Sequence, residues 1–267
     1  MPDALQTIID GLTASSKYRD LAPAALERTA RWALERQSKP AAALKVAKRK
    51  LHQAFGAYLD PGALNAVDKA LDELEAGGDL RDICSRVLRL HRSSAERRAS
   101  LEAFYNVIWD ETGLPTNVLD VAAGLNAFAL PWMGLPAETR YHALEIDRRL
   151  CSATDRLLCA TGLPGEATWS DVLSDFSPGT PDVALILKTL PCLEQQEPGA
   201  SDAILTALAS VPLIVITFPV RSLGGQEKGM RENYLDQIER LAGRNHRDLT
   251  VLPFDDELIA ILRRAES

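Results

Sequence analysis

The amino-acid sequence predicts an α/β protein in which an all-helical N-terminal domain precedes a Rossmann-like, doubly wound sheet. Three observations predict this fold. Residues 3–105 show helical periodicity with almost no strand signal, short apolar strands alternate with helical segments from Asn117 onward, and one apolar strand runs through Asp120 into a tight turn of small residues. We therefore expect two domains, over residues 1–105 and 106–267.

The helical part is predicted from apolar residues that recur at helical spacing. Pro23 suits the first turn of a helix, where its missing N–H costs no hydrogen bond, and Gly77-Gly78 suits a helix end. Ser94 is expected to cap a long helix that runs to Trp109. The other expected helices are 5–12, one that begins at Pro23, 42–58, 64–74 and 81–90.

The second part is predicted to contain seven strands. Helical segments separate most of them, which favours parallel pairing, but the last two leave no room for a helix and are expected to pair antiparallel. This number of strands is typical of a class I, Rossmann-like methyltransferase. The expected strands are 118–121, 141–146, 167–169, 183–187, 213–218, 248–253 and 259–263.

Charge is unevenly distributed along the chain. The formal net charge of −7 argues against a nucleic-acid partner, but residues 17–50 contain ten basic residues against three acidic ones. The field near such a cluster dominates within a Debye length, so this stretch is expected to neutralise phosphates. The alternative for any single Lys or Arg is a solvated helix surface.

The four cysteines show neither a CxxC pair nor a metal-ligand spacing, and no histidine cluster joins them. We expect reduced, mostly buried thiols and no metal ion. Residues 1–12 lack the apolar core of a signal peptide, and no apolar run approaches the length of a membrane span. The sequence thus predicts a soluble protein of the cytoplasm.

The turn after the first strand indicates the kind of cofactor. A dinucleotide site needs three glycines in the pattern GxGxxG, whereas Gly124 is the only glycine here, which favours S-adenosylmethionine, a ligand without phosphate. Asp120 and Glu145 are then expected to bind its ammonium and ribose. Asp171, with Val172, is expected at the adenine, where its carboxylate would accept from the exocyclic amine. The alternative for Asp120 is a helix cap.

Several longer motifs resemble one known family, the aminoglycoside-resistance 16S rRNA (guanine(1405)-N(7))-methyltransferases. The motifs extend through most of the chain. They are Ser16-Lys17-Tyr18-Arg19, Leu51-His52 with Gly56-Ala57-Tyr58, 90–97, 119–126, 131–136, 187–194 and 217–225, followed by Lys228-Gly229-Met230 and Asn233-Tyr234. Four positions depart from the usual family residue: Ala123 for Cys, Ala127 for Pro, Glu145 for Asp and Val220 for Thr.

This resemblance implies a role for further residues. Arg97 would pair with the methionine carboxylate, since a guanidinium makes two parallel bonds; its alternative is a surface ion pair with Glu96 or Glu102. The other cofactor residues implied are Tyr58, His91, Arg92, Ser93, Ala122, Gly124, Leu187 and Gln196. The RNA-binding residues implied are Lys17, Arg19, Lys45, Lys48, Arg49, Lys50, Arg221 and Lys228.

The implied reaction requires no general base, because guanine N7 carries a free lone pair. Lys188, Arg221 and Trp109 are candidates for positioning the reactants, and Trp109, Tyr105 or Phe218 could stack on a flipped base. The implied substrate is the assembled 30S ribosomal subunit, approached by a monomer. Two rival functions are a small-molecule methyltransferase, which predicts an apolar capping domain, and a non-catalytic RNA-binding protein, which predicts no S-adenosylmethionine binding.

Overall fold

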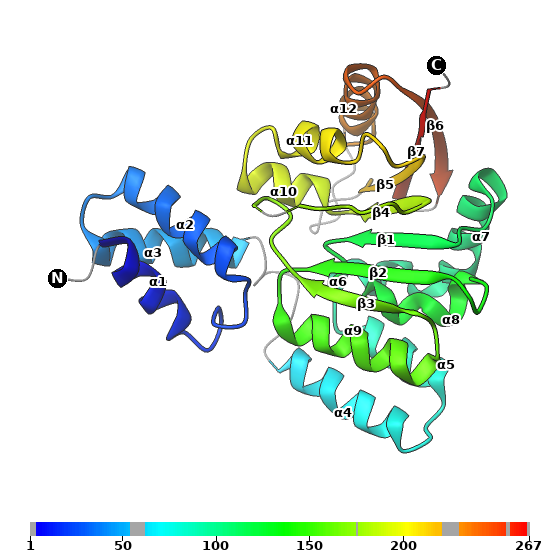
Figure 1. Cartoon of the computed structure of the whole chain (residues 1–267), viewed down its shortest axis with the longest axis horizontal. Helices are drawn as coiled ribbons and strands as arrows, with labels where there is room; N and C mark the ends of the chain where they lie inside the picture. Colours follow the sequence, from blue (N-terminus) through cyan, green and yellow to red (C-terminus); the bar gives the residue numbers. More distant parts are fainter. Residues whose placement is uncertain (1–3, 54–61, 175, 221–229, 255–256, 266–267) are drawn as a thin grey trace.

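The computed structural model describes residues 4–53, 62–174, 176–220, 230–254 and 257–265. Its centre is a seven-stranded sheet of order β3-β2-β1-β4-β5-β7-β6 (Figure 1). Strands β1 to β5 are parallel, and β7 lies antiparallel between β5 and β6. The strands are β1 (Asn117–Val121), β2 (Arg140–Glu145), β3 (Gly165–Trp169), β4 (Val183–Leu187), β5 (Leu213–Pro219), β6 (Arg247–Phe254) and β7 (Glu257–Arg264).

The predicted sheet is confirmed, because each of the seven expected strands is present with bounds within two residues of those expected. The parallel arrangement and the antiparallel end are also as expected, so the observed topology is that of the predicted Rossmann-like sheet.

Helices cover both faces of the sheet, so its central strands are buried on both sides. One core contains Val183 and Leu185 of β4, and the other contains Ala184 and Ile186 of the same strand, as the alternation of side chains along a strand requires. The first core is covered by α4 (Ala63–Glu75), α5 (Leu80–Leu88), α7 (Leu101–Thr112), α8 (Leu130–Met133) and α9 (Arg148–Thr161). The second is covered by α10 (Leu190–Gln196), α11 (Ala200–Ala207) and α12 (Met230–Arg244).

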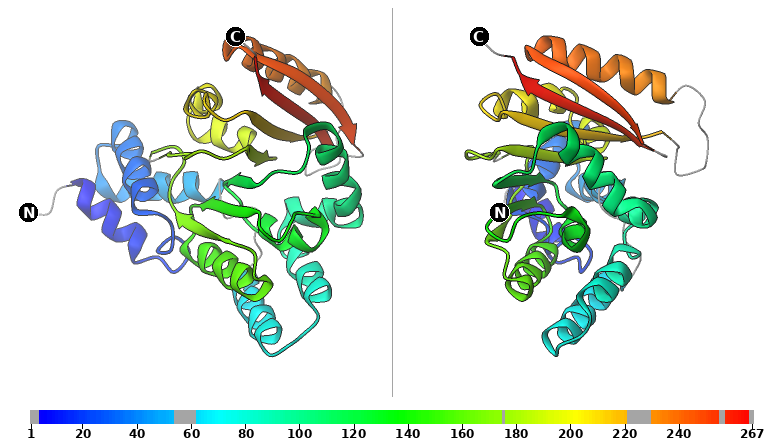
Figure 2. Two further views of the ribbon diagram at one scale, coloured as in Figure 1. Left: turned by 45° about the vertical axis from the view of Figure 1, so that its right-hand side comes forward. Right: turned by 90° about the vertical axis from the view of Figure 1, so that its right-hand side faces the viewer.

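The first three helices form a separate unit beside the sheet, as Figure 1 and the left view of Figure 2 show. They are α1 (Ala4–Thr13), α2 (Pro23–Arg36) and α3 (Pro40–Leu51), and they pack around their own core, which includes Ile8, Leu26 and Leu51. We call residues 4–53 the N-terminal lobe and the rest the body. Helices α4, α5 and α7 share a core with the sheet, so the packing favours this division over the expected one between residues 105 and 106.

The helix expected from Ser94 to Trp109 is interrupted. The chain instead forms α6 (Arg92–Arg97), a 3₁₀ turn η2 (Arg98–Ser100) and α7, with His91 rather than a serine at the start of α6. Ser100 leaves the helical conformation (φ −125°, ψ 16°), and its hydroxyl donates to the Arg97 carbonyl at 3.3 Å. Such local side-chain bonds compete with a continuous helix.

The cysteines are only partly as expected. All four are free thiols; Cys84 and Cys151 are buried, whereas Cys192 is half-buried and Cys159 is exposed. Within the described residues, no group of three or more His, Cys, Asp or Glu side chains could hold a metal ion. None of the helices in this part of the chain is long and apolar enough to cross a membrane.

Candidate functional site

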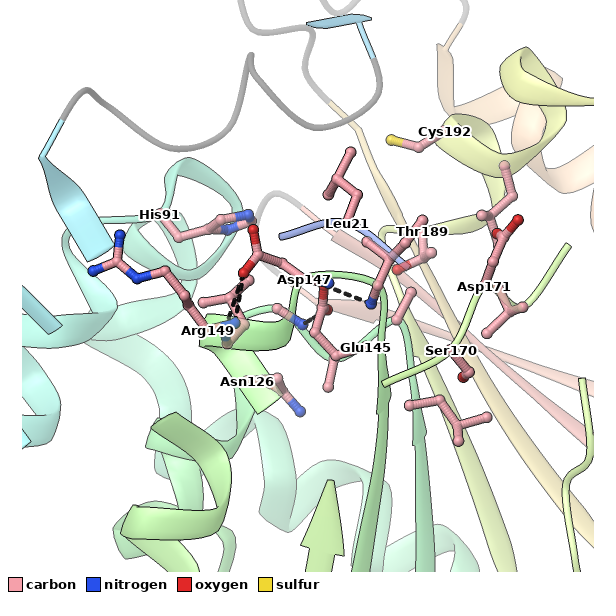
Figure 3. A pocket seen from close by; sticks show the side chains of 18 of the residues that line it. Leu21, His91, Asn126, Glu145, Asp147, Arg149, Ser170, Asp171, Thr189 and Cys192 are labelled. Atoms are coloured by element: carbon pink, nitrogen blue, oxygen red, sulfur yellow. Dashed lines mark hydrogen bonds between the residues drawn. The ribbon is translucent and has the colours of Figure 1, made fainter. Parts of the chain in front are cut away.

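A cavity of about 960 Å³ lies between the carboxyl ends of the central strands and the N-terminal lobe (Figure 3). Strand β1 has β2 on one side and β4 on the other, so the chain leaves the sheet in opposite directions here, which is where open α/β sheets bind ligands. The body lines the cavity with the segments that follow β1, β2, β3 and β4, and with residues from 62–65 and 91–94. The lobe contributes Ser16, Lys17, Tyr18, Leu21, Arg28 and His52.

The small-residue turn after β1 forms one wall of the cavity. Ala122 and Gly124 both have left-handed backbone conformations, with φ of 54° and 55°. A Cβ atom on Gly124 would meet only the His91 ring, at 3.9 Å, so the conformation rather than lack of space favours glycine there. The Gly124 N–H donates to the Glu145 carboxylate at 2.8 Å, which joins the ends of β1 and β2.

Asp120, at the end of β1, lies in the cavity wall but is almost completely buried. Its carboxylate accepts from Asn126 Nδ2 at 2.9 Å and from the Tyr141 hydroxyl, and Asn126 Oδ1 in turn accepts from Tyr105. Burial raises the pKa of Asp120 to about 6, although these hydrogen bonds partly oppose the shift. The bonds go to side chains, so Asp120 does not act as the helix cap considered as an alternative.

Glu145, at the end of β2, is held by three backbone N–H groups. Beside the bond from Gly124, its carboxylate accepts from Ile146 N at 2.9 Å and from Asp147 N at 3.0 Å. The longer arm of a glutamate at this position is therefore accommodated by the turn around it. Burial raises the pKa of Glu145 to about 7 despite these bonds.

Asp171, just after β3, is held by an arginine of the lobe. Arg28 donates to the two oxygens of Asp171 through Nε at 2.9 Å and Nη2 at 3.2 Å. The same carboxylate accepts from the Ser174 hydroxyl at 2.7 Å and from Leu173 N at 3.3 Å. These four bonds fix the direction of the Asp171 carboxylate at this end of the cavity.

Two polar atoms of the cavity wall lack a hydrogen-bond partner among the described residues: Ser170 Oγ and Gln196 Oε1. Buried polar atoms are nearly always paired, so such atoms at a cavity indicate groups that a ligand satisfies. In Figure 3, His91 and Asp171 lie on opposite sides of the cavity with Glu145 between them. An elongated ligand with an N–H donor at one end and a diol in the middle, such as S-adenosylmethionine, fits this arrangement.

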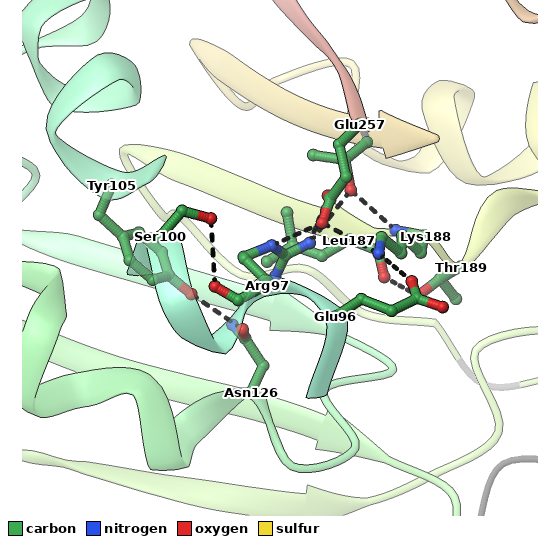
Figure 4. A network of polar contacts seen from close by, with 10 residues as sticks. Glu96, Arg97, Ser100, Tyr105, Asn126, Leu187, Lys188, Thr189 and Glu257 are labelled. Atoms are coloured by element: carbon green, nitrogen blue, oxygen red, sulfur yellow. Dashed lines mark hydrogen bonds and ion pairs between the residues drawn. The ribbon is translucent and has the colours of Figure 1, made fainter. Parts of the chain in front are cut away.

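Arg97 does not line the cavity, contrary to the expectation that it binds a methionine carboxylate. It is almost completely buried and donates to Glu257 of β7 through Nη2 at 2.6 Å and Nε at 2.9 Å (Figure 4). Lys188, which does line the cavity, pairs with the same Glu257 at 3.0 Å and with Glu96 at 2.7 Å. The alternative of a surface ion pair for Arg97 is also wrong, because its partner is buried Glu257.

This network fixes the segment that follows β4. Lys188 has a left-handed backbone (φ 57°), and its N–H donates to the carbonyl and to the hydroxyl of Thr217, both at 3.0 Å. Burial alone would raise the pKa of Glu257, but Arg97 and Lys188 hold it below its ordinary value. Glu257 therefore remains a carboxylate that balances two buried cations beside the cavity.

The other expected cofactor residues are placed as follows. Ala122, Val172, Leu187 and His91 line the cavity. Burial, and secondarily Lys188, lowers the pKa of His91 to about 4, so its imidazole is neutral at physiological pH. Tyr58 lies outside the described residues, as do the side chains of Arg92 and Ser93.

The three aromatic candidates for stacking on a base lie in the core of the body and not at the cavity. Trp109 donates from its indole N–H to Met133 O at 2.7 Å and stacks on Tyr105 at 6.0 Å between ring centroids. Phe218 stacks on Tyr234 at 4.7 Å. Trp109 is thus corrected from a positioning candidate to a core residue, because α7 packs its apolar face against the sheet.

The expected RNA-binding cations separate into exposed and buried ones. Lys17, Arg19, Lys45 and Arg49 are exposed and Lys48 is half-buried, whereas Arg221 and Lys228 lie outside the described residues. Lys50 is a correction to the set: it is only 8% exposed, and its ammonium donates to the Gln196 carbonyl at 2.5 Å. A cation enclosed in this way cannot contact a phosphate without leaving its place.

Some lining residues were not predicted. Asn126, Thr189 and Cys192 lie within motifs that the sequence had singled out, so their position was a usable signal. Arg28 gave no such signal, because its partner Asp171 is 143 residues away in the chain.

Comparison with known proteins identifies the family to which the chain is similar. Residues 14–260 match the family described as ribosomal RNA methyltransferase (FmrO). A 16S rRNA (guanine(1405)-N(7))-methyltransferase of Micromonospora echinospora is 37% identical over 98% of this chain and 97% of its own. The enzyme of the same name from Serratia marcescens is 36% identical over 89% and 88% of the two chains.

The chain belongs to this family. Among solved structures, the 16S rRNA methyltransferase RmtF in complex with S-adenosyl-L-homocysteine superposes with a TM-score of 0.86 at 29% identity, covering 99% of this chain and 100% of that one. The 16S rRNA methylase RmtB gives 0.81 at 27% identity, with 99% and 100% covered. The resemblance found in the motifs is thus confirmed, and the chain is a ribosomal RNA methyltransferase. Membership over nearly its whole length disfavours both rival functions.

Proposed function

We propose that this chain transfers a methyl group from S-adenosylmethionine to N7 of guanine 1405 of 16S rRNA, at the decoding site of the assembled 30S subunit. The modification would make the host resistant to aminoglycosides. The observation that carries the proposal is the 37% identity, over 98% of the chain, to an enzyme named for this reaction. A cavity at the switch point of the sheet, where open α/β sheets bind ligands, supports the proposal.

The cofactor would lie along the cavity with its ribose at Glu145, as a carboxylate at the end of the second strand suits a ribose diol. Its adenine would lie near Asp171 and Gln196, whose unpaired Oε1 can accept from an amine. Its methionine part would lie toward Asp120 and the loop that contains Gly124. S-adenosylmethionine supplies an electrophilic methyl group on its sulfonium, the product of which is the S-adenosyl-L-homocysteine found in RmtF.

The residues of the chain contribute position and exclusion of water rather than proton transfer. Guanine N7 attacks through a lone pair that needs no deprotonation, and Asp120 is already bonded to Asn126 and Tyr141. Lys188 is held by Thr217 on its backbone and by two carboxylates on its ammonium, so the wall beside it is rigid. Holding the reactants in line in this way removes much of the entropic barrier of a bimolecular reaction.

The substrate would be approached through the N-terminal lobe. Its exposed cations Lys17, Arg19, Lys45 and Arg49 can neutralise phosphates, and Lys17 also lines the cavity. In an A-form helix N7 lies in a deep, narrow groove that side chains cannot enter, so the target guanine would be flipped out or its helix opened. We infer that the enzyme works as a monomer, without a metal ion, in the cytoplasm where its substrate is assembled.

The experiment that tests the proposal is primer extension on 16S rRNA from 30S subunits incubated with the chain and S-adenosylmethionine. Borohydride and aniline cleave RNA at N7-methylguanine, so the expected result is a strand break at guanine 1405. The matched controls are 16S rRNA stripped of its ribosomal proteins and a reaction without cofactor. In both, the 16S rRNA should remain uncleaved. Intact rRNA from complete 30S reactions, with cofactor binding shown separately, would overturn the assignment to N7.

A further inference from the structure

The N-terminal lobe contacts the body beside the cofactor cavity. Its residues 20–22 pair with the segment that follows Glu145: Ala22 N donates to Ile146 O at 2.8 Å, and Arg148 N donates to Asp20 O at 2.8 Å. The cavity is lined from both sides of this junction. A ligand that fills it must therefore contact the lobe and the body together.

Arg28 of α2 makes a two-point contact across the junction. Its Nε and Nη2 bind different oxygens of Asp171, which is only 2% exposed, while the Arg28 side chain is 18% exposed and lines the cavity. Two parallel N–H···O bonds fix both the distance and the orientation of a carboxylate, which a single point charge does not. The contact thus sets the direction of the Asp171 side chain at the end of the cavity assigned to adenine.

Lys50 of α3 makes a second contact at the same end. Its ammonium donates to the carbonyl of Gln196 and lies 4.0 Å from the centroid of the Trp32 ring. The side chain of Gln196, a residue of the cavity wall, carries the buried Oε1 that lacks a hydrogen-bond partner among the described residues. Two cations of the lobe therefore hold two residues of the adenine end, and neither cation is available for RNA.

We propose that Arg28 is a positioning residue for the cofactor: through Asp171 it joins the RNA-docking lobe to the adenosine end of the cavity and couples the placement of the lobe to cofactor binding. The inference rests on the proposed function for the identity of the cofactor and of the lobe's partner. Because such coupling is reciprocal, a cofactor that favours the joined arrangement also favours the orientation in which the lobe docks.

An ordinary surface ion pair on the same helix provides the comparison. Arg31 pairs with Glu27 at 2.5 Å, but both side chains are largely exposed, at 63% and 48%, and neither lines the cavity. Exposed pairs of this kind contribute little. Arg31→Ala is therefore a matched control for Arg28→Ala, since it removes the same side chain from the same helix without crossing the junction.

The test is the affinity of the purified full chain for S-adenosyl-L-homocysteine, measured by titration calorimetry without RNA. Arg28→Ala is expected to raise Kd about 10-fold, within the usual range of coupling between sites, whereas Arg31→Ala stays within about twofold. Arg28→Lys is expected to lose affinity to an intermediate degree, because lysine keeps the charge but not the two-point contact. Should Arg28→Ala fail to fold, Arg28→Lys carries the comparison.

Two further measurements distinguish a positioning role of Arg28 from a nonspecific structural effect of the substitution. If Arg28 acts through Asp171, the double variant Arg28→Ala/Asp171→Asn binds no more weakly than Asp171→Asn alone. In 30S methylation, Arg28→Ala should raise KM for S-adenosylmethionine about 10-fold and leave kcat within about twofold, because saturating cofactor restores the joined arrangement.

The outcomes distinguish this inference from the proposed function. Two results would overturn the role of Arg28 and leave the proposed function intact. One is a Kd of Arg28→Ala equal to that of wild type. The other is a double variant whose rise in Kd is the product of the rises caused by Arg28→Ala and Asp171→Asn separately. A wild-type chain that does not bind S-adenosyl-L-homocysteine overturns both.

Discussion

Replacing Glu257 by glutamine should strongly destabilise the protein. Glu257 is 5% exposed and accepts two bonds from Arg97 and one from Lys188, so the substitution leaves two buried cations without their shared carboxylate. Removing one partner of a buried ion pair costs about 3–5 kcal/mol. At about 2–4 °C per kcal/mol for a chain of this size class, the midpoint of thermal unfolding should fall by about 6–20 °C.

The matched control is Glu96→Gln, which makes the same chemical change and also removes a partner of Lys188. Glu96 is 49% exposed, so its loss is expected to lower the free energy of unfolding by about 1 kcal/mol or less. Urea unfolding of the three proteins at pH 7 measures both values. Equal effects of the two substitutions would refute the argument, because burial would then make no difference to the pairs.

Three other predictions concern the cavity and the lobe. The pKa of Glu145 is raised from its ordinary value of 4.5 to about 7, so its contribution to stability is fully present below pH 4.5 and is lost as pH rises through 7. Between pH 4.5 and 7, urea unfolding should show that the free energy of unfolding of wild type falls by about 3 kcal/mol, a fall that is missing in Glu145→Gln. The same pH dependence in both proteins would contradict the prediction. Gly124→Ala should cost only about 1–2 kcal/mol of unfolding free energy, because the strain comes from φ 55° and not from a clash; a larger loss in a urea titration would show that space also matters. Lys45→Gln and Arg49→Gln should each lower the log–log salt slope of 30S binding by about 0.7–0.9, whereas Lys50→Gln leaves it unchanged; a lower slope for Lys50→Gln would place that ammonium on RNA.

The sheet could be predicted from the sequence because its strands are buried on both faces. Strands such as Val183–Leu187 and Leu213–Pro219 are near-continuous apolar runs between turns, and this pattern depends only on local sequence. The residues at the ends of β1, β2 and β3 were predictable for the same reason. Once the strands are parallel, their carboxyl ends lie at one edge, so Asp120, Glu145 and Asp171 had to lie near one another.

The partners of the charged residues could not be predicted, because they come from distant parts of the chain. Arg97 and Glu257 are separated by 160 residues, and Lys50 and Gln196 by 146. A sequence shows that a cationic side chain is present, but not whether a carboxylate or carbonyl lies within hydrogen-bond distance of it in the folded chain. The interruption at Ser100 was missed for a different reason: the apolar period continues through it, and the local bond from the Ser100 hydroxyl to the Arg97 carbonyl gives no signal in that period.

The two buried carboxyl groups of the cavity link ligand binding to pH and to stability. Glu145 and Asp120 are carboxyl groups whose pKa values are raised by burial, so ionising either of them costs free energy. Hydroxyl or ammonium groups of a ligand would donate to these carboxylates and favour ionisation, which predicts proton release on binding and tighter binding as pH rises through 6 to 7. Since only the folded chain offers this site, the same ligand raises stability according to its concentration relative to Kd. Cofactor binding, protonation of Glu145 and the placement of the lobe are therefore parts of one equilibrium, since Arg28 and Lys50 join the lobe to the walls of the same cavity.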